Sequence, residues 1–318
     1  MSSSTDSPKI PSYALCRYAW GFLVYSIIVI LWGTVVRATG AGAGCGNHWP
    51  LCNGTMVQHS PTISTLIEFG HRATSGISLI GAIVLVTWTW MATVRGHLAR
   101  WAATAALLFM FIEALLGALL VTLGLTAQSQ SPLRAPYLAL HLTNTLLLLA
   151  ALCLTAHLLG RRKAFLARDV QVVSPSNCLA AVLFVLIVGV SGSLAALGDT
   201  LFPARSLSNA FAHDFSAESE WLVRWRWTHP ALAVLASILL IWLLVRATKR
   251  GGLAEVRNNR GLSIVVLALL IVEYALGALN VALLAPVWMQ VAHLLGADLL
   301  WCSLVVLTAR LTLRPRIR

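Results

Sequence analysis

Long apolar runs separated by short polar segments make up most of this sequence. A helix needs about 20 predominantly apolar residues to cross the hydrocarbon core of a bilayer, which is roughly 30 Å thick. Eight runs reach that length, near residues 18–39, 66–94, 101–126, 136–159, 177–197, 222–246, 261–284 and 288–309. The pattern predicts an all-α polytopic membrane protein with eight transmembrane helices.

The composition agrees with this interpretation and excludes two other classes. With 58% hydrophobic residues, 11% charged residues and a mean hydropathy of +0.80, the chain lies outside the range of soluble domains. The net charge of +12 is divided among short clusters between the apolar runs. Charge distributed in this way sets membrane topology, so binding to nucleic acid is excluded and the lipid bilayer is the expected surroundings.

The same clusters predict how the helices are oriented. When the loops are assigned alternately to the two sides, one side receives 17 of the 23 Lys and Arg residues and both chain ends. Cytoplasmic loops carry the excess of these residues, so both termini are expected in the cytoplasm. The polar N-terminal stretch leads straight into a full-length apolar run, and no cleaved signal peptide is expected. We predict a multi-pass protein of the bacterial or archaeal plasma membrane.

The two halves of the sequence resemble each other. Glu113 and Glu273, which open similar segments, are 160 residues apart. Each half then has four helices, and the two copies share one orientation, as in parallel repeats. The predicted organisation is an N-terminal four-helix bundle at 1–159, a cytoplasmic linker at 160–176 and a C-terminal four-helix bundle at 177–318.

Histidines occur at repeat-related positions within the apolar runs. His71, His141, His229 and His293 fall in the second, fourth, sixth and eighth runs, near the predicted outer edge of the hydrocarbon. Two histidines on two helices of a four-helix bundle can hold a haem iron by both axial positions. A single membrane histidine often only bonds a neighbouring hydroxyl or carbonyl, but four at matching depth favour haem. Zinc and copper usually recruit further ligands.

An acid accompanies the histidine in the first half alone. Glu68 lies three residues before His71, on the same helix face, whereas Arg226 lies three residues before His229. The difference predicts that chemistry occurs in the first half and that the second half holds a haem for electron transfer or structure. A solvated carboxylate at the helix entrance is the alternative interpretation.

Other charged residues near the apolar runs have less specific interpretations. Glu113 and Glu273 occur in both halves and favour a shared structural hydrogen bond, while Asp298 is left unassigned. Three arginines are candidates for contacts with haem propionates, with interfacial anchoring as the alternative: Arg72, Arg224 and Arg226.

Residues 42–54, "GAGCGNHWPLCNG", form a segment that we call the cysteine loop. It is predicted to lie outside the cytoplasm, where thiols tend to oxidise. Cys45 and Cys52 are seven residues apart, and the glycines and Pro50 allow the chain to reverse between them. We predict a Cys45–Cys52 disulfide. Whether it is a structural staple or a redox relay stays open.

Over nearly its whole length the sequence resembles the haem A synthase family. "VVRATGAGAGCGNHWPLCNG" at 35–54 resembles the first outer loop, and "IEFGHR" at 67–72 resembles the acid and histidine of the second helix. The other histidine segments are "HLTNT" at 141–145, "WTH" at 227–229 and "QVAHLLGA" at 290–297. The loop is specific, and the histidine segments are specific only together.

The resemblance implies an oxidoreductase of haem biosynthesis that converts haem O to haem A for cytochrome oxidase. The C8 methyl group is hydroxylated twice, and the geminal diol loses water to give a formyl group. His71 and His141 would bind the substrate haem O, Glu68 would take part in the oxidation, and His229 and His293 would bind haem b as cofactor. A haem O synthase and cytochrome oxidase assembly factors are the implied partners, and a homo-oligomer is left open.

Two features depart from the family pattern. Residues 198–221 contain no cysteine, whereas some members carry a second cysteine pair there. Pro230 follows His229, and a proline inside a helix tends to kink it, so the two haem sites are expected to differ in shape. The alternative functions are a di-haem b-type membrane electron-transfer protein and a haem carrier, neither of which explains Glu68 or the cysteine loop.

Overall fold

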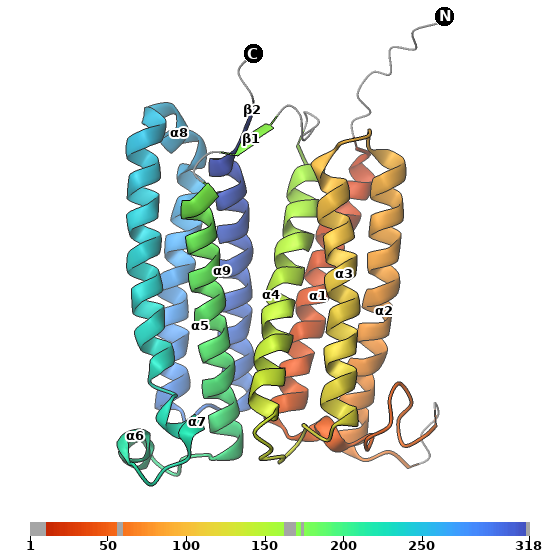
Figure 1. The fold of residues 1–318 in the computed structure, drawn as a ribbon, viewed down its shortest axis with the longest axis vertical. Helices are drawn as coiled ribbons and strands as arrows, with labels where there is room; N and C mark the ends of the chain where they lie inside the picture. Colours follow the sequence, from red (N-terminus) through yellow and green to blue (C-terminus); the bar gives the residue numbers. More distant parts are fainter. Residues whose placement is uncertain (1–10, 56–59, 162–169, 173–174, 316–318) are drawn as a thin grey trace, which may run out of the picture.

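The structure is a computed structural model of the 318-residue chain, and it describes residues 11–55, 60–161, 170–172 and 175–315. Most of these residues are helical, and the long helices stand side by side with nearly parallel axes (Figure 1). The prediction of an all-α polytopic membrane protein is confirmed.

The first half of the chain forms one group of four long helices. These are α1 (Tyr13–Ala38), α2 (Ile63–Ala92), α3 (Leu98–Thr122) and α4 (Arg134–Leu159). Ser12 and Thr62 are the N-caps of α1 and α2, because their hydroxyl oxygens accept hydrogen bonds from backbone N–H groups in the first turn. A short 3-10 helix, η1 (Ala41–Ala43), leads from α1 into the cysteine loop.

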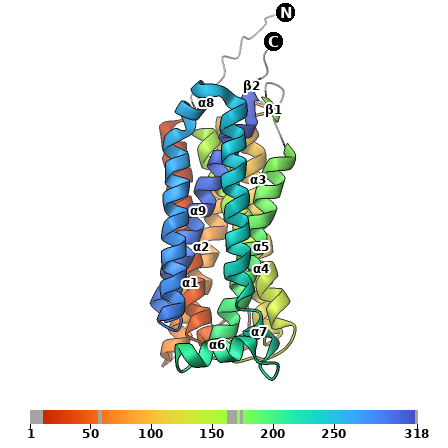
Figure 2. The same cartoon turned by 90° about the vertical axis from the view of Figure 1, so that its left-hand side faces the viewer.

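The second half contains three long helices: α5 (Pro175–Leu201), α8 (Thr228–Ala282) and α9 (Val287–Thr312). The 55-residue α8 reverses direction, so its two limbs run side by side (Figures 1 and 2). Seven described segments are long and apolar enough to cross a membrane, including the second limb at Asn259–Ala282. Together with the limb that begins at Thr228, they correspond to the eight predicted crossings.

The beginning of α1 and the end of α9 lie at the same end of the molecule (Figure 1). At that end β1 (Val170–Val172) pairs antiparallel with β2 (Leu313–Pro315), a short ladder that the all-helical prediction did not include. The predicted linker at 160–176 lies partly outside the described residues. The arrangement agrees with the prediction that both chain ends are on one side.

The opposite end of the molecule carries the cysteine loop and two short helices. These are α6 (Leu207–Phe215) and α7 (Trp221–Arg224), of which α6 lies across the bundle axis (Figure 2). The helices α2, α4, α8 and α9 all begin at this end (Figure 1). Residues early in these four helices are therefore brought to the same end of the molecule.

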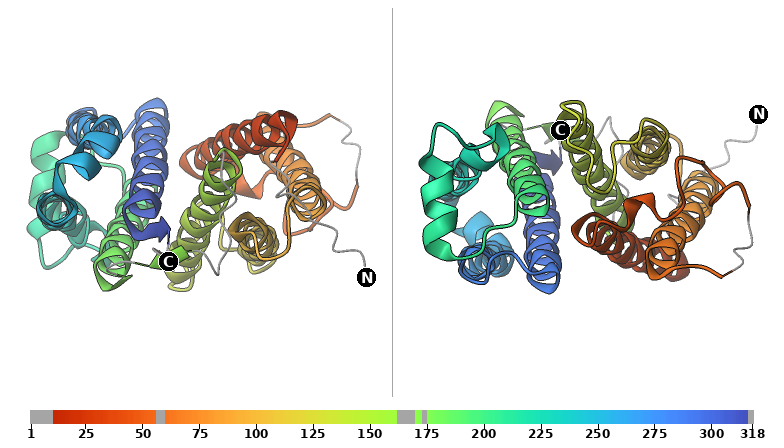
Figure 3. Two further views of the ribbon diagram at one scale, coloured as in Figure 1. Left: turned by 90° about the horizontal axis from the view of Figure 1, so that it is seen from above. Right: turned by 90° about the horizontal axis from the view of Figure 1, so that it is seen from below.

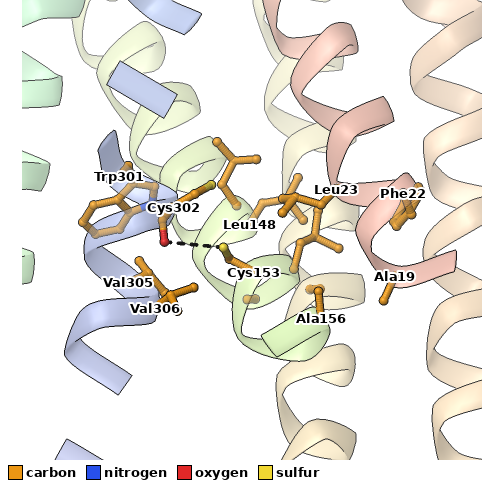
Figure 4. Packing of buried hydrophobic residues seen from close by; sticks show 14 of the residues in the cluster. Ala19, Phe22, Leu23, Leu148, Cys153, Ala156, Trp301, Cys302, Val305 and Val306 are labelled. Carbon is orange, nitrogen blue, oxygen red and sulfur yellow. Dashed lines mark hydrogen bonds between the residues drawn. The ribbon is translucent and has the colours of Figure 1, made fainter. Parts of the chain in front are cut away.

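The two groups of helices meet where α1 and α4 of the first half pack against α5 and α9 of the second (Figure 3). Trp301 of α9 is fully buried there, and its indole N–H donates a 2.7 Å hydrogen bond to the carbonyl oxygen of Leu146 in α4. Cys153 of α4 lies 3.6 Å from the carbonyl oxygen of Cys302, among buried apolar side chains (Figure 4). This interface fixes the position of one half against the other.

Pro230 does not kink the helix that follows His229. The helix α8 begins at Thr228, so Pro230 is its third residue. Backbone N–H groups in the first turn have no partner within the helix, and a proline costs no hydrogen bond there. The position of Pro230 therefore gives no reason for a kink, and the expected difference in shape between the two sites stays a prediction.

Candidate functional site

The four predicted histidines all lie in the opening turns of their helices. His71 is the ninth residue of α2, His141 the eighth of α4, His229 the second of α8 and His293 the seventh of α9. Because these four helices begin at the same end, all four histidines lie toward that end of the bundle.

In the second half the two histidines face each other. The ring centres of His229 and His293 are 6.3 Å apart, and their planes are inclined by 73°. A metal–imidazole bond is about 2 Å long, so one metal atom bound between two imidazole nitrogens separates the ring centres by about 6 Å. The distance between the two rings therefore leaves room for a single iron atom.

In the first half His71 and His141 are close enough for their charges to interact. The Nδ1 atoms of both rings are buried and have no hydrogen-bond partner that meets normal geometry among the described residues. Each half thus brings together one histidine pair, as the repeat predicted. No group of three or more His, Cys, Asp or Glu that could hold a bare metal ion occurs in the described chain, so the donor set fits a haem, which needs only two protein ligands.

A carboxylate lies beside one histidine of each pair. Glu113 Oε1 is 3.5 Å from His141 Nδ1, and Glu273 Oε2 is 3.0 Å from His293 Nδ1. The predicted shared role of the two glutamates is thus a contact with a histidine. A carboxylate beside a metal-binding imidazole orients the ring and increases its basicity.

The two carboxylates differ in their other partners. Asn144 Nδ2 and Thr145 Oγ1 each donate a 2.5 Å hydrogen bond to Glu113. The residues at the equivalent places in the second half, 152 positions later, are Gly296 and Ala297, which have no such donors. Glu273 Oε1 is consequently buried without a partner in the described chain, and the buried Asp298 lies near enough to interact with it.

Glu68 is buried, not solvated. Its exposed fraction is 3%, and Oε2 accepts a 2.8 Å hydrogen bond from the backbone N–H of Cys45. Its Oε1 forms an ion pair with Arg72, which also donates hydrogen bonds to the carbonyl oxygens of His48 and Leu51. The alternative of a solvent-facing carboxylate at the helix entrance is wrong.

The cysteine loop packs directly onto the start of α2. Cys45 and Cys52 form a disulfide with a Cα–Cα distance of 4.4 Å, and both residues are fully buried. Thr65 Oγ1 donates a 2.9 Å hydrogen bond to the carbonyl oxygen of Gly44. Gly44 has no room for a side chain, because a Cβ atom there would collide with the backbone of Ser64 and Thr65. The loop thus covers the helix turn that carries Glu68.

In the second half a positively charged residue, Arg226, occupies the position that corresponds to Glu68. Arg226 donates hydrogen bonds of 2.8 Å to Asp199 and 2.9 Å to Asp214. Burial acts to lower the pKa of Arg226, but the hydrogen bonds and charges of the two aspartates outweigh it and raise the pKa above the ordinary value. Arg224 is exposed. The proposed propionate contacts of Arg72, Arg224 and Arg226 stay a prediction.

Arg37 has a role that the sequence did not reveal. It lies at the end of α1, within the segment "VVRATG", and donates hydrogen bonds to Ala196 O and Thr200 Oγ1 of α5 and to Gln290 Oε1 of α9. It therefore joins the two halves near the level of the histidines. In the sequence, the only signal for this role was that Arg37 lies within the segment "VVRATG", which resembles the haem A synthase family.

Comparison with known proteins places the chain in a family. A family model described as cytochrome oxidase assembly protein matches residues 16–305. The chain belongs to this family. Several of the similar curated proteins carry the name heme A synthase, so the resemblance to haem A synthases is confirmed.

Individual relatives match in part. Two proteins of Thermus thermophilus strains, named protoheme IX farnesyltransferase, are 42% identical over 302 residues, which is 94% of this chain and 49% of theirs. The heme A synthase of Alkalihalophilus pseudofirmus is 39% identical over 130 residues, 40% of each chain. That of Exiguobacterium sp. is 34% identical over 155 residues, 48% of each chain. The chain spans about half the length of the curated relatives it matches, or less.

Proposed function

We propose that this chain is a haem A synthase, which oxidises the C8 methyl group of haem O to a formyl group within the membrane. The observation that carries the proposal is the placement of Glu68. It is a buried carboxylate one turn before His71, bonded to a disulfide-closed loop, and its counterpart in the second half is an arginine. A protein that only carried electrons would need two histidine pairs but no such difference.

The substrate haem would be held in the first half by His71 and His141. Glu113 would orient His141, and Asn144 and Thr145 would hold that carboxylate in place. The second half would hold haem b between His229 and His293, where it would supply one-electron transfer. The propionates of the two haems are expected near the level of Arg72, Arg224 and Arg226.

Glu68 would act beside the reacting methyl group as an acceptor. Both of its oxygens already accept, one from the N–H of Cys45 and one from Arg72. This arrangement fixes the orientation of the carboxyl group. Each carboxylate oxygen can accept more than one hydrogen bond, so Glu68 would still accept one from a hydroxyl group on the substrate while Arg72 stays in place on two loop carbonyls.

The names of the relatives support a farnesylated haem as substrate. The Thermus relatives are named for the transfer of a farnesyl group to protohaem IX, which is the chemistry that precedes the proposed oxidation. We therefore propose a haem O synthase as the source of the substrate. Cytochrome oxidase assembly, named by the family, is the proposed destination of the product.

The proposed orientation places the arginine-rich end in the cytoplasm of a bacterial or archaeal cell. The cysteine loop, α6 and α7 then lie at the outer face of the plasma membrane, where a disulfide persists. A reporter enzyme active only in the cytoplasm, fused after Arg318, is expected to be active. The same reporter inserted in the loop at Gly54 is expected to be inactive, and the reverse result would overturn the orientation.

The function is tested by analysing extracted haems. Cells expressing the chain together with a haem O synthase are expected to accumulate a formylated haem, detected by chromatography with mass detection. Glu68→Gln should abolish it, whereas Glu218→Gln, which alters an exposed carboxylate at the same end, should not. If haem O passes through unchanged while the purified protein holds haem b, the electron-transfer alternative replaces the proposal. Haem O that is bound and released unaltered would favour a carrier.

A further inference from the structure

Each of the four histidines packs the Cε1 edge of its ring against a glycine in the preceding membrane crossing. The pairs are Gly33 with His71, Gly117 with His141, Gly192 with His229, and Gly277 with His293. Gly33 and Gly192 are 159 residues apart, and Gly117 and Gly277 are 160 apart. The glycines therefore follow the same repeat as the histidines.

A glycine inside a helix requires a reason, because it is less favourable there than alanine. These four lie within α1, α3, α5 and the second limb of α8. The four glycines differ in how little room they leave for a side chain. A Cβ atom built on Gly192 would lie 2.9 Å from the histidine Cε1, which is closer than atoms approach without a shift. One built on Gly33 would lie 3.0 Å from it, so the ring would have to move by a few tenths of an ångström.

The other two contacts are looser. The same distance is 3.3 Å for Gly277 and 4.0 Å for Gly117, and the last value is ordinary van der Waals contact. The two tight glycines thus face His71 and His229, and the two looser ones face His141 and His293. The looser pair belongs to the histidines that have a glutamate beside them.

The tight pair instead has a backbone carbonyl beside the ring. His229 Nδ1 is 3.2 Å from the carbonyl oxygen of Val188 and 3.1 Å from Ser191 Oγ, and the carbonyl of Val29 lies next to His71. Each valine is four residues before its glycine. A Cβ atom at Gly192 would lie 3.2 Å from His229 Nδ1, and one at Gly33 would lie 3.3 Å from His71 Nε2, so a side chain at either glycine would displace the ring.

We propose that Gly33 and Gly192 are positioning residues that let the rings of His71 and His229 lie directly against the preceding helix. For His229 this places Nδ1 beside the carbonyl oxygen of Val188 and the hydroxyl of Ser191 and leaves Nε2 to bind the iron. Each haem would then be held by one histidine positioned through a glycine and by one that has a glutamate beside it. The inference rests on the proposed haem binding but not on the oxidation of haem O.

Single alanine substitutions test this inference, with glycines of the same helices as controls. A Cβ atom at Gly21 in α1 or Gly261 in α8 would meet nothing within 4 Å. The full chain is expressed with haem supplied and purified with haem bound. The measured quantity is the fraction of bound haem in the six-coordinate low-spin form, by absorption and electron paramagnetic resonance spectra.

Gly33→Ala and Gly192→Ala are expected to lose most of the low-spin signal of the affected haem. Gly277→Ala should change the spectrum with the haem retained, and Gly117→Ala, Gly21→Ala and Gly261→Ala should resemble the unaltered protein. Helix content and the thermal midpoint are measured on the same samples. A low-spin fraction unchanged in Gly33→Ala and Gly192→Ala, or lowered equally in Gly21→Ala, overturns the inference.

A second set of variants separates positioning from general damage to the fold. In His71→Ala protein, Gly33→Ala has no ring to displace and should cause no further loss of thermal stability. An equal loss with and without His71 would show that the alanine acts elsewhere.

The proposed haem binding and the proposed oxidation of haem O would fail in different ways. An unaltered protein without a low-spin haem contradicts the proposed haem sites, whereas normal spectra without haem A production contradict only the oxidation.

Discussion

The backbone N–H of Cys45 donates a 2.8 Å hydrogen bond to Glu68 Oε2. This bond joins the disulfide-closed cysteine loop to the acid that lies one turn before His71. The loop and the acid are therefore one structural unit, and a change in either is expected to affect the first half before the second.

The disulfide is expected to hold the loop over Glu68. Cys45→Ser should lower the yield of haem A and leave the haem in the second half, because His229 and His293 have no contact with the loop among the described residues. Loss of a disulfide that closes a small loop costs about 2 to 3 kcal/mol. Haem extraction measures both effects, with Cys16→Ser, a free cysteine in the described chain, as the control. Simultaneous loss of both haems would instead indicate a general folding role.

The ion pair of Glu68 and Arg72 predicts an unequal response to single and double substitution. The Glu68 side chain is buried and the Arg72 side chain nearly so, with exposed side-chain fractions of 4% and 10%. Removing one partner of a buried pair leaves an uncompensated charge and costs about 3 to 5 kcal/mol. Glu68→Gln should therefore lower the thermal midpoint more than the double variant Glu68→Gln with Arg72→Gln. Additive effects of the two substitutions would contradict a direct interaction.

The contact of Glu273 with His293 predicts a difference between the haem potentials. A carboxylate beside the ligand makes the imidazole a stronger donor and favours ferric iron. Glu273→Gln should raise the reduction potential of the second haem, and Glu113→Gln should raise that of the first by less, because its distance to histidine is 3.5 Å and not 3.0 Å. Redox titration followed by absorption measures both. An unchanged potential in Glu273→Gln would exclude this role.

His97 predicts a loss of stability in acid. It is the N-cap of α3, and its Nδ1 accepts a 3.1 Å hydrogen bond from the backbone N–H of Ala99. Burial lowers the pKa of His97 below its ordinary value of 6.5, and the charge of Arg100 lowers it further. The unfolded chain thus binds a proton more readily than the folded one.

The stabilising contribution of His97 is therefore present above pH 6.5 and is lost as the pH falls through the lowered pKa. Protonation also removes the acceptor, and an N-cap contributes about 1 kcal/mol. His97→Asn keeps an acceptor that does not titrate, so its thermal midpoint should fall less between pH 8 and pH 5, values chosen to span roughly the titration of a histidine. Parallel pH profiles for the two proteins would exclude His97 as the cause.

The arrangement of helices could be predicted largely from the sequence. Spans of about 20 apolar residues and a repeat shown by Glu113 and Glu273 determine the number and order of crossings, because a membrane helix must satisfy its own backbone and be apolar along its length. The boundary at His229 was placed less well. The predicted run from 222 includes α7, and only the structure shows that Pro230 falls in the first turn of α8.

The candidate site was predictable in its residue types but not in its contacts. The sequence by itself determined four histidines at repeat positions, one acid in one half and two cysteines seven residues apart. The spacing of residues along one helix determines which of them share a face. It does not determine which neighbouring helix that face packs against.

Tertiary structure decided the partners of those residues. The burial of Glu68 under the cysteine loop, the Asp199 and Asp214 contacts of Arg226, and the glycines behind the histidines all join segments separated along the chain. Such contacts depend on the rotation and height of packed helices, and side chains from several helices set these together. A polar or ring contact of this kind leaves no periodic signal in the sequence, because each helix contributes only one member of the pair.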